Sequence, residues 1–339
     1  MRALMITGTE SCAWGRIPEP VPGAGEVLVA VRHLGLCGSD LATYLGFNPL
    51  VSLPRIPGHE IGVEVLGAGP DVPAAYAPGR RGLVLPYTSC GTCPSCRRGR
   101  VNACRSNRTL GVQQDGGLTE RLVLPYGKVL LNDTLAPRHL ALVEPLSVGF
   151  HAASRGRVGP GDRVLVLGCG MIGLGAVAGA AARGAEVIAV DVAPAKLVLA
   201  ERFGARHTVA GGGTDLAARI DALTGGDGAD VAIEAVGLPL TFRQAVEFAS
   251  FSGRVVTIGY CKEPVSFETK FFNLKELDFL GSRNALREDF EAVISWLEAR
   301  ETPPDDVISK VFPFAEAAEA LPYWKARRDE TLKVMIAWP

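Results

Sequence analysis

Residues 163–191 read RVLVLGCGMIGLGAVAGAAARGAEVIAVD and carry the clearest structural pattern of the chain. An apolar strand pattern leads into G-C-G-M-I-G, with glycines at Gly168, Gly170 and Gly173. A run of small helix-forming residues follows, and a second apolar strand ends at Asp191. Gly168 permits a tight turn, Gly170 lets the backbone approach a pyrophosphate, and Gly173 lets the helix pack closely on the strand. The free N–H groups at the helix N-terminus would face the phosphates, so the stretch predicts a dinucleotide site.

Asp191 stands where a carboxylate accepts hydrogen bonds from the adenosine ribose and repels a 2′-phosphate, which favours NAD over NADP. The alternative is a glycine-rich turn followed by a surface aspartate, and the agreement of strand, helix and acid argues against it. The residues expected to contact the cofactor are Gly168, Gly170, Met171, Ile172, Gly173, Asp191, Val236 and Gly259.

Outward from this unit, apolar strands alternate with helical patterns as far as residue 281. Such alternation predicts a doubly wound parallel sheet, the Rossmann arrangement, because near-continuous apolar runs suit strands buried on both faces. Residues 1–145 are instead rich in short strands punctuated by proline and glycine. The predicted fold is α/β, and its six parallel strands fall at 164–167, 187–190, 207–209, 231–234, 255–258 and 278–281.

A chain of 339 residues is long enough for two domains. Its composition, 47% hydrophobic and 21% charged, is that of a globular protein. The net charge of -1 gives no broad attraction to nucleic acid or anionic lipid. Without a long apolar run or a signal-peptide pattern, the chain is expected in the cytoplasm, acting on a small molecule.

Four of the eight cysteines, Cys90, Cys93, Cys96 and Cys104, form C-x2-C-x2-C-x7-C. In a reducing compartment such a cluster indicates a metal site rather than disulfides. Four thiolates close the coordination of one Zn²⁺, so this site would be structural. An iron–sulfur cluster is the alternative, but its common run ends C-x3-C-P, with a shorter last gap.

Three further segments, 35–40 (GLCGSD), 57–60 (PGHE) and 143–152 (VEPLSVGFHA), carry possible ligands of a second metal. Cys37, His59 and either Glu60 or Glu144 offer sulfur, nitrogen and oxygen. Three protein ligands with one exchangeable position are typical of catalytic zinc. Singly, each residue has an ordinary structural explanation: a core cysteine, a satisfied histidine, or a glutamate near a helix end.

The order of these segments resembles the layout of the zinc-dependent medium-chain dehydrogenases over essentially the whole chain. EPLSVG is most similar to the branch of sorbitol and threonine dehydrogenases. The resemblance implies a GroES-like catalytic domain at 1–145 with a structural-zinc lobe at 85–106, a Rossmann NAD-binding domain at 146–284, and a return to the catalytic domain at 285–339. It also implies a homodimer or homotetramer, for which 271–281 is a plausible contact.

The resemblance further implies residue roles. Cys37 and His59 would bind a catalytic zinc, with Glu60 as third or reserve ligand. Glu144 would bind the metal or hold its water, and Ser39 would accept the proton of the substrate hydroxyl. Many relatives carry a histidine relay residue where this chain has Ala42. The proton would then leave through the cofactor ribose and water, or through the neighbouring Thr43 or Tyr44.

The predicted reaction is reversible oxidation of a secondary hydroxyl of a polyol or sugar acid to the ketone, with NAD and two zinc ions per chain. Arg283 and Arg121 could pair with a substrate carboxylate, although a surface position explains each equally well. Alternatives are a threonine-type amino-acid dehydrogenase, a zinc-bearing quinone or enone reductase, and a non-catalytic NAD-binding zinc protein.

Overall fold

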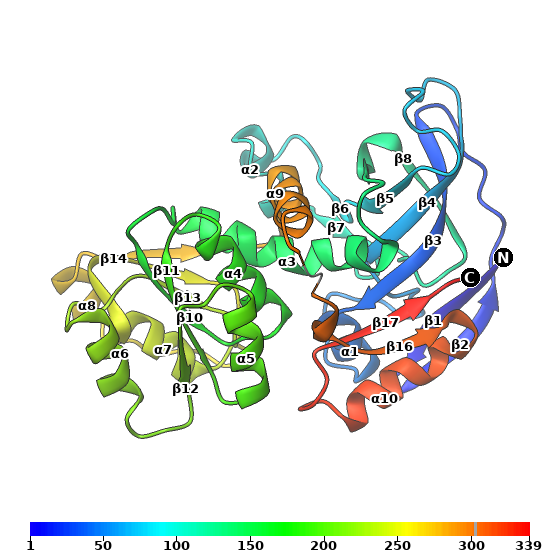
Figure 1. Cartoon of the computed structure of the whole chain (residues 1–339). Coiled ribbons are helices and arrows are strands. Elements are labelled where there is room, and N and C mark those ends of the chain that lie inside the picture. The colour runs from blue at the N-terminus through cyan, green and yellow to red at the C-terminus, as the bar shows by residue number, and fades with distance from the viewer. Residues whose placement is uncertain (302–303) are drawn as a thin grey trace. The chain divides into compact units, whose positions relative to one another are not determined.

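The computed structural model describes residues 1–301 and 304–339 (Figure 1). The chain divides into two compact units, Met1–Glu144 with Leu297–Pro339, and Pro145–Trp296. The return to the first unit therefore lies at residue 297 and not at 285, where the sequence suggested it. The cause is helix α9 (Arg287–Glu298), whose Asp289 is hydrogen-bonded to His151 and whose Trp296 packs on Phe150 and Phe203.

The unit Pro145–Trp296 confirms the Rossmann prediction. Its sheet has six strands among the described residues, in the order β12-β11-β10-β13-β14-β15, and every pairing is parallel. The strand order reverses between β10 and β13, where such sheets bind dinucleotides. The strands are β10 (Arg163–Leu167), β11 (Glu186–Asp191), β12 (His207–Ala210), β13 (Ala229–Glu234), β14 (Ala249–Thr257) and β15 (Asp278–Gly281).

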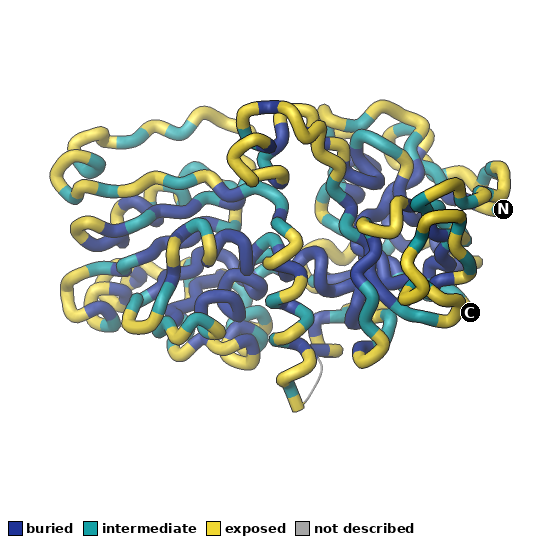
Figure 2. Tube along the Cα trace, turned by 90° about the horizontal axis from the view of Figure 1, so that it is seen from above, coloured by how far each residue is buried: buried dark blue, intermediate teal, exposed yellow. Residues whose placement is uncertain are grey.

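Helices connect these strands and cover the sheet, so the central strands are buried along nearly their whole length (Figure 2). This burial explains the near-continuous apolar runs seen in the sequence. Besides α9, the helices are α4 (Met171–Ala181), α5 (Pro194–Arg202), α6 (Leu216–Thr224), α7 (Pro239–Phe248) and α8 (Lys270–Leu274).

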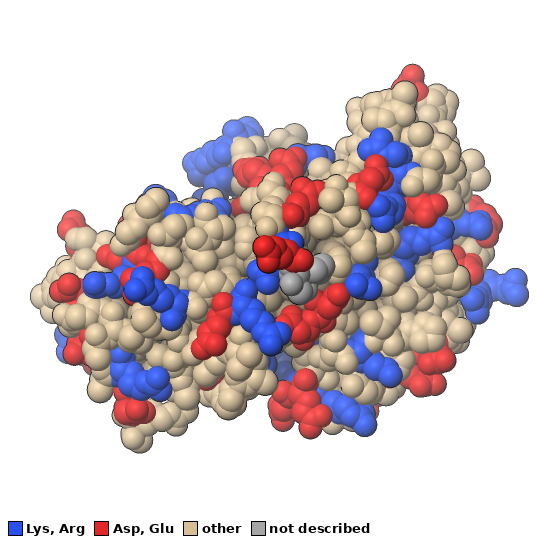
Figure 3. All heavy atoms as spheres, viewed as in Figure 1, with Lys and Arg blue, Asp and Glu red and all other residues tan. Residues whose placement is uncertain are grey.

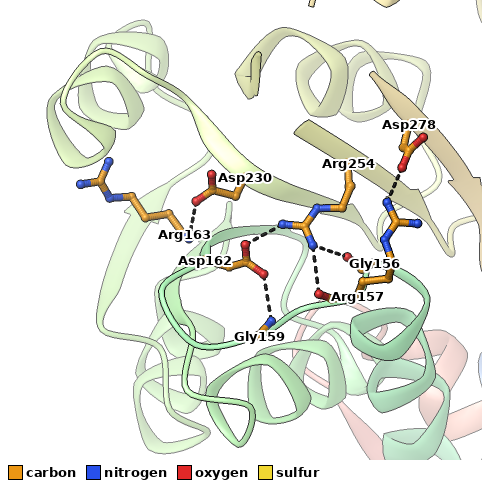
Figure 4. Close-up of polar contacts among 8 residues, drawn as sticks. All are labelled: Gly156, Arg157, Gly159, Asp162, Arg163, Asp230, Arg254 and Asp278. Carbon is orange, nitrogen blue, oxygen red and sulfur yellow. Dashed lines mark hydrogen bonds and ion pairs between the residues drawn. The ribbon is translucent and has the colours of Figure 1, made fainter. Parts of the chain in front are cut away.

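A polar network fixes the amino ends of the central strands (Figure 4). Arg254 of β14 donates to the carboxylate of Asp162 (2.6 Å) and to the carbonyl of Gly156 (2.8 Å). Asp230 of β13 accepts a hydrogen bond from the backbone N–H of Arg163 (2.8 Å). The network joins β10, β13 and β14 at the end of the sheet opposite the glycine turn, so it has a structural role.

The other unit is built on a mostly antiparallel sheet, as expected for a GroES-like domain, in which only β16 and β17 are paired in parallel among the described strands. Seven strands are seen in the described ranges, in the order β16-β17-β3-β4-β5-β9, with β8 also paired to β3. The C-terminal strand β17 pairs with β3 (Val334↔Leu36), so the tail of the chain completes this sheet. The strands are β3 (Glu26–Leu36), β4 (Glu60–Ala68), β5 (Arg81–Val84), β8 (Arg121–Pro125), β9 (Val129–Leu131), β16 (Ile308–Pro313) and β17 (Lys333–Ala337).

A hairpin of β1 (Arg2–Gly8) and β2 (Ser11–Arg16) adds to this unit, as do helices α1 (Gly38–Tyr44) and α10 (Ala320–Ala326). Helix α3 (Pro137–Arg155) contains the boundary between the units at Glu144. The cysteine-rich lobe holds β6 (Tyr87–Thr88), α2 (Pro94–Arg97), the 3₁₀ turn Val101–Ala103 and β7 (Arg108–Thr109).

Positive and negative side chains are interspersed over the face shown in Figure 3, in keeping with the near-zero net charge. Across the described part of the chain, no helix combines the length and apolar character needed to cross a bilayer.

Candidate catalytic and cofactor sites

The segment GLCGSD forms the start of α1 and places Cys37 at its N-cap. Asp40, three residues into the helix, accepts a hydrogen bond from the N–H of Cys37 (2.8 Å). Its other carboxylate oxygen accepts the N–H of Gly58 (3.1 Å), next to His59. The buried Asp40 therefore ties the two ligand-bearing segments together. Asp40 was not among the residues predicted for the site, although an acidic residue three positions after an N-cap is a recognisable signal.

Cys37, His59 and Glu60 come together as predicted, with their ligand atoms all within 4.8 Å of one another. Glu60 begins β4 and lies opposite Gly35 of β3, where a Cβ would collide with the Glu60 carboxylate. His59 and Glu60 are buried, and Nδ1 of His59 has no hydrogen-bond partner among the described residues. A buried sulfur, nitrogen and oxygen set with an unsatisfied ring nitrogen fits a zinc ion.

The charge on His59 depends on its neighbours. Burial alone would lower the pKa of His59, but the adjacent Cys37, which also hydrogen-bonds to it, and then Glu144 and Asp40 raise that pKa well above the usual value. Such an accumulation of negative ligand groups is the environment in which a divalent cation is stabilised.

Glu144, on α3, lies outside the compact set of three in the part of the chain described here, and is also buried. Burial raises the pKa of its carboxyl group, against the opposing influence of His59. Its Oε1 accepts a hydrogen bond from the phenol of Tyr87. The pKa of Tyr87 is raised by burial and by the Glu144 charge, so the phenol stays protonated and acts as donor.

Lys333 is a second residue that sequence reasoning missed. Its ammonium lies 2.6 Å from both carboxylate oxygens of Glu60 and 3.0 Å from the carbonyl of Leu36, and the pair is almost wholly buried. No local pattern in the sequence pointed to it, because 273 residues separate the partners. Only the pairing of β17 with β3 brings Lys333 to the site.

Ser39 lies two residues after the N-cap Cys37, and its hydroxyl is buried without a hydrogen-bond partner in the described structure. An unsatisfied buried hydroxyl is available to a ligand. Thr43, offered above as a relay, donates to the carbonyl of Ser39 (2.8 Å) and accepts from Asn48 (3.0 Å). The Thr43 hydroxyl therefore uses its proton within the helix, and its oxygen is contacted by the Asn48 amide. Tyr44 is buried, its carbonyl bonded to the N–H of Glu10.

The four cysteines of the lobe converge. The sulfur of Cys93 lies 3.5 Å from that of Cys96 and 3.9 Å from that of Cys104, which is 3.6 Å from that of Cys90. Four sulfurs at about 2.3 Å from a tetrahedral Zn²⁺ would be spaced by about 3.8 Å. Backbone N–H groups donate to these sulfurs, which lowers the pKa of Cys90 to about 6 and that of Cys93 to about 7. The lobe therefore fits a structural zinc ion.

The residues predicted to contact a dinucleotide lie at the carboxyl ends of the parallel strands. Gly168 has φ +95, and Gly170 is the N-cap of α4 with no atom where its Cβ would lie. A side chain on Gly173 would strike the carbonyl of Gly168, so glycine is required there. Val236, after β13, lies against Gly168. Met171, Ile172 and Gly259 complete the predicted set, on α4 and after β14.

Asp191 is positioned at the end of β11, as predicted, and has a second role. One carboxylate oxygen accepts the N–H of Cys169 inside the glycine turn (2.7 Å), and the other accepts the N–H of Ala193 (2.9 Å). The same carboxylate can therefore shape the phosphate-binding turn and face a ribose. Arg121, in contrast, is an exposed residue of β8 paired with Glu19 (2.6 Å), which supports a surface role.

Comparison with known proteins agrees with this geometry. Residues 23–133 match the alcohol dehydrogenase GroES-like domain, and residues 172–299 match the zinc-binding dehydrogenase family. L-galactonate-5-dehydrogenase of Escherichia coli K12 is 34% identical over 338 residues, covering 100% of this chain and 99% of that protein. The chain belongs to the zinc-dependent medium-chain dehydrogenase family. It is thus an oxidoreductase of the alcohol dehydrogenase type, using zinc and a nicotinamide cofactor.

Two solved structures show the same fold with cofactor bound. RspB of E. coli CFT073, in complex with NADH, is 30% identical with a TM-score of 0.91, covering 99% of each chain. A zinc-binding dehydrogenase of Sinorhizobium meliloti, bound to NADP, is 31% identical with a TM-score of 0.88, covering 99% of this chain and 98% of that one. Relatives therefore differ in the cofactor they hold.

Proposed function

We propose that this dehydrogenase oxidises a secondary hydroxyl of a sugar acid to the ketone, reversibly, with NAD as hydride acceptor. The observation that carries the proposal is the buried convergence of Cys37, His59 and Glu60 near an unsatisfied Ser39 hydroxyl. The choice of a sugar acid over a neutral polyol rests on the similarity to L-galactonate-5-dehydrogenase along the whole chain.

Cys37, His59 and Glu60 would hold the catalytic zinc, because they form the compact donor set and Glu144 does not belong to it. When bound, zinc supplies Lewis acidity that lowers the pKa of a substrate hydroxyl. Glu144, oriented by Tyr87, would hold a water or substrate hydroxyl beside the metal. Ser39 would relay the hydroxyl proton, accepting it at its unsatisfied Oγ while its own proton passes on to water.

NAD is preferred in this proposal because Asp191 carries a negative charge where a 2′-phosphate would have to lie. Gly168, Gly170, Met171, Ile172, Gly173, Val236 and Gly259 would form the remaining cofactor contacts. A second zinc would be held by Cys90, Cys93, Cys96 and Cys104, giving two per chain.

We also propose a homodimer or homotetramer joined through the sheet edge. β15 is an edge strand, Phe279 on it is 42% exposed, and it packs edge-on against Phe267 and Phe272. An exposed edge strand with aromatic side chains is suited to pairing with a second copy. Light scattering after size-exclusion chromatography should show an oligomer that Phe279→Asp weakens, and a monomeric wild type would refute this.

The proposed function is tested by following NAD and NADP reduction on L-galactonate, sorbitol and threonine, before and after dialysis against a chelator. Chelator-sensitive NAD reduction on L-galactonate supports it. Turnover only on threonine would favour an amino-acid dehydrogenase. Zinc and NAD binding without any turnover would favour the non-catalytic alternative.

A further inference from the structure

Tyr87 lies between the cysteine-rich lobe and the proposed catalytic site of the same unit. Its phenol donates to Glu144, and its charge environment includes Cys37 and Glu60. Along the chain, Tyr87 forms β6 with Thr88, and only Ser89 separates this strand from Cys90, the first cysteine of the lobe. A residue at the base of the cysteine-rich lobe therefore reaches the proposed catalytic site.

The base of the lobe is a short neck, residues 86–88 and 108–110. Its ladder has two residue pairs, Tyr87↔Thr109 and Thr88↔Arg108, and the N–H of Leu110 donates to the carbonyl of Pro86 (3.1 Å). A two-stranded ladder this short is not stable alone. It must also close the loop 89–107, which has an entropic cost.

Leu110 anchors one strand of the neck in the main hydrophobic core of the unit, but within residues 89–107, all of them described, no apolar side chain other than cysteine is buried. The buried cluster of the lobe consists of Cys93, Cys96 and Cys104 themselves. Without a metal, no covalent or coordination bond joins the cysteines. A metal bound to all four would cross-link the loop 89–107. Metal in the lobe should therefore tighten the pairing of the Tyr87 strand with the core-anchored strand at Leu110.

We propose that the metal-closed lobe holds Tyr87 against Glu144, which makes Tyr87 a positioning residue for the carboxylate beside the catalytic metal. The inference rests on the proposed function for its two metal sites. The hydrogen bond from the Tyr87 phenol fixes the orientation of the buried Glu144 carboxylate. If the neck loosened, Tyr87 could move away and this hydrogen bond would be lost. A competing anchor exists, because the ammonium of Lys128 donates to the carbonyl of Tyr87.

The experiment is a double-mutant cycle of Tyr87→Phe and Cys90→Ser on the full-length protein. Hydrogen–deuterium exchange reports the Leu110 amide of the neck, and steady-state kinetics on L-galactonate report kcat and KM. Tyr76→Phe is the matched control, because it removes a phenol hydrogen bond to the carbonyl of Val129 in the same unit.

Tyr87→Phe should lower kcat about tenfold, the value of one hydrogen bond to a charged group, with little change in the KM for NAD. Cys90→Ser should speed exchange at Leu110 about tenfold or more and lower kcat similarly, yet cause no further loss in the Tyr87→Phe background. Cys90→His keeps a zinc ligand and should restore both readouts. If Cys90→Ser does not fold, Cys90→His replaces it, and its amide exchange and kcat are measured at increasing chelator concentrations.

Additive losses in the cycle, or a loosened neck with unchanged kcat, would overturn the inference and leave Lys128 as the effective anchor. A neck that stays ordered in Cys90→Ser would overturn it too. If wild type turns over no substrate while Cys90→Ser still loosens the neck, the proposed function fails, but the link between lobe and neck is supported.

Discussion

The buried ion pair of Lys333 and Glu60 gives the sharpest test of the catalytic unit. Lys333→Met keeps most of the aliphatic volume but removes the ammonium that contacts both Glu60 oxygens at 2.6 Å. The two side chains are 2% and 0% exposed, so water cannot replace the lost partner. Leaving one charge of a buried pair uncompensated costs about 3–5 kcal/mol, and we expect this loss in the free energy of unfolding.

The control is Lys325→Met. Lys325 and Glu10 are also separated by 2.6 Å, but both side chains are 46% exposed. Solvent screens such a pair, and its loss should cost about 0–1 kcal/mol. Because the two variants make the same chemical change at the same distance, their difference isolates the effect of burial.

Urea denaturation with and without zinc is the assay. Zinc at the Cys37–His59–Glu60 site would give Glu60 another cation, so zinc should stabilise Lys333→Met more than it stabilises wild type. Adding Glu60→Gln to Lys333→Met should recover most of the loss, since no buried charge remains. A loss below about 1 kcal/mol, or one that zinc does not change, would refute this account of the pair.

Other predictions concern single sites. Ser39→Ala should lower kcat about 100-fold, the usual contribution of a proton-transfer group, with zinc content unchanged by metal analysis. Asp191→Asn keeps an acceptor for the Cys169 N–H but removes the charge, so steady-state kinetics should show the NAD-to-NADP preference falling about tenfold. In metal-stripped protein at pH 7, iodoacetamide should modify Cys90, whose pKa is lowered to about 6 by hydrogen bonds from Thr92. Cys169, whose pKa burial raises to about 12, should stay unmodified by mass spectrometry. Equal labelling of the two thiols would contradict their assigned environments.

The domain architecture could be predicted because its determinants are local. Residues 163–191 contain two apolar strand patterns, the G-x-G-x-x-G turn and Asp191, which together predict one strand–turn–helix–strand unit. The four cysteines fall within fifteen residues, so their convergence needs only one short loop. The residue at which the chain returns to the first unit could not be predicted as well. The amphipathic pattern of α9 is compatible with either unit, and only the contacts of Trp296 with Phe150 and Phe203 show where the helix packs.

The chemical groups of this chain can be read from its sequence: a glycine-rich turn, a four-cysteine lobe, and a cysteine, a histidine and two glutamates suited to a metal. How the two glutamates differ depends on the fold. Strand β17 brings Lys333 to Glu60 across 273 residues, and β6 brings Tyr87 to Glu144 across 57. A carboxylate's role depends on its burial and on the charge or donor beside it. These partners are brought together by tertiary contacts between segments far apart in the sequence, which no local pattern encodes.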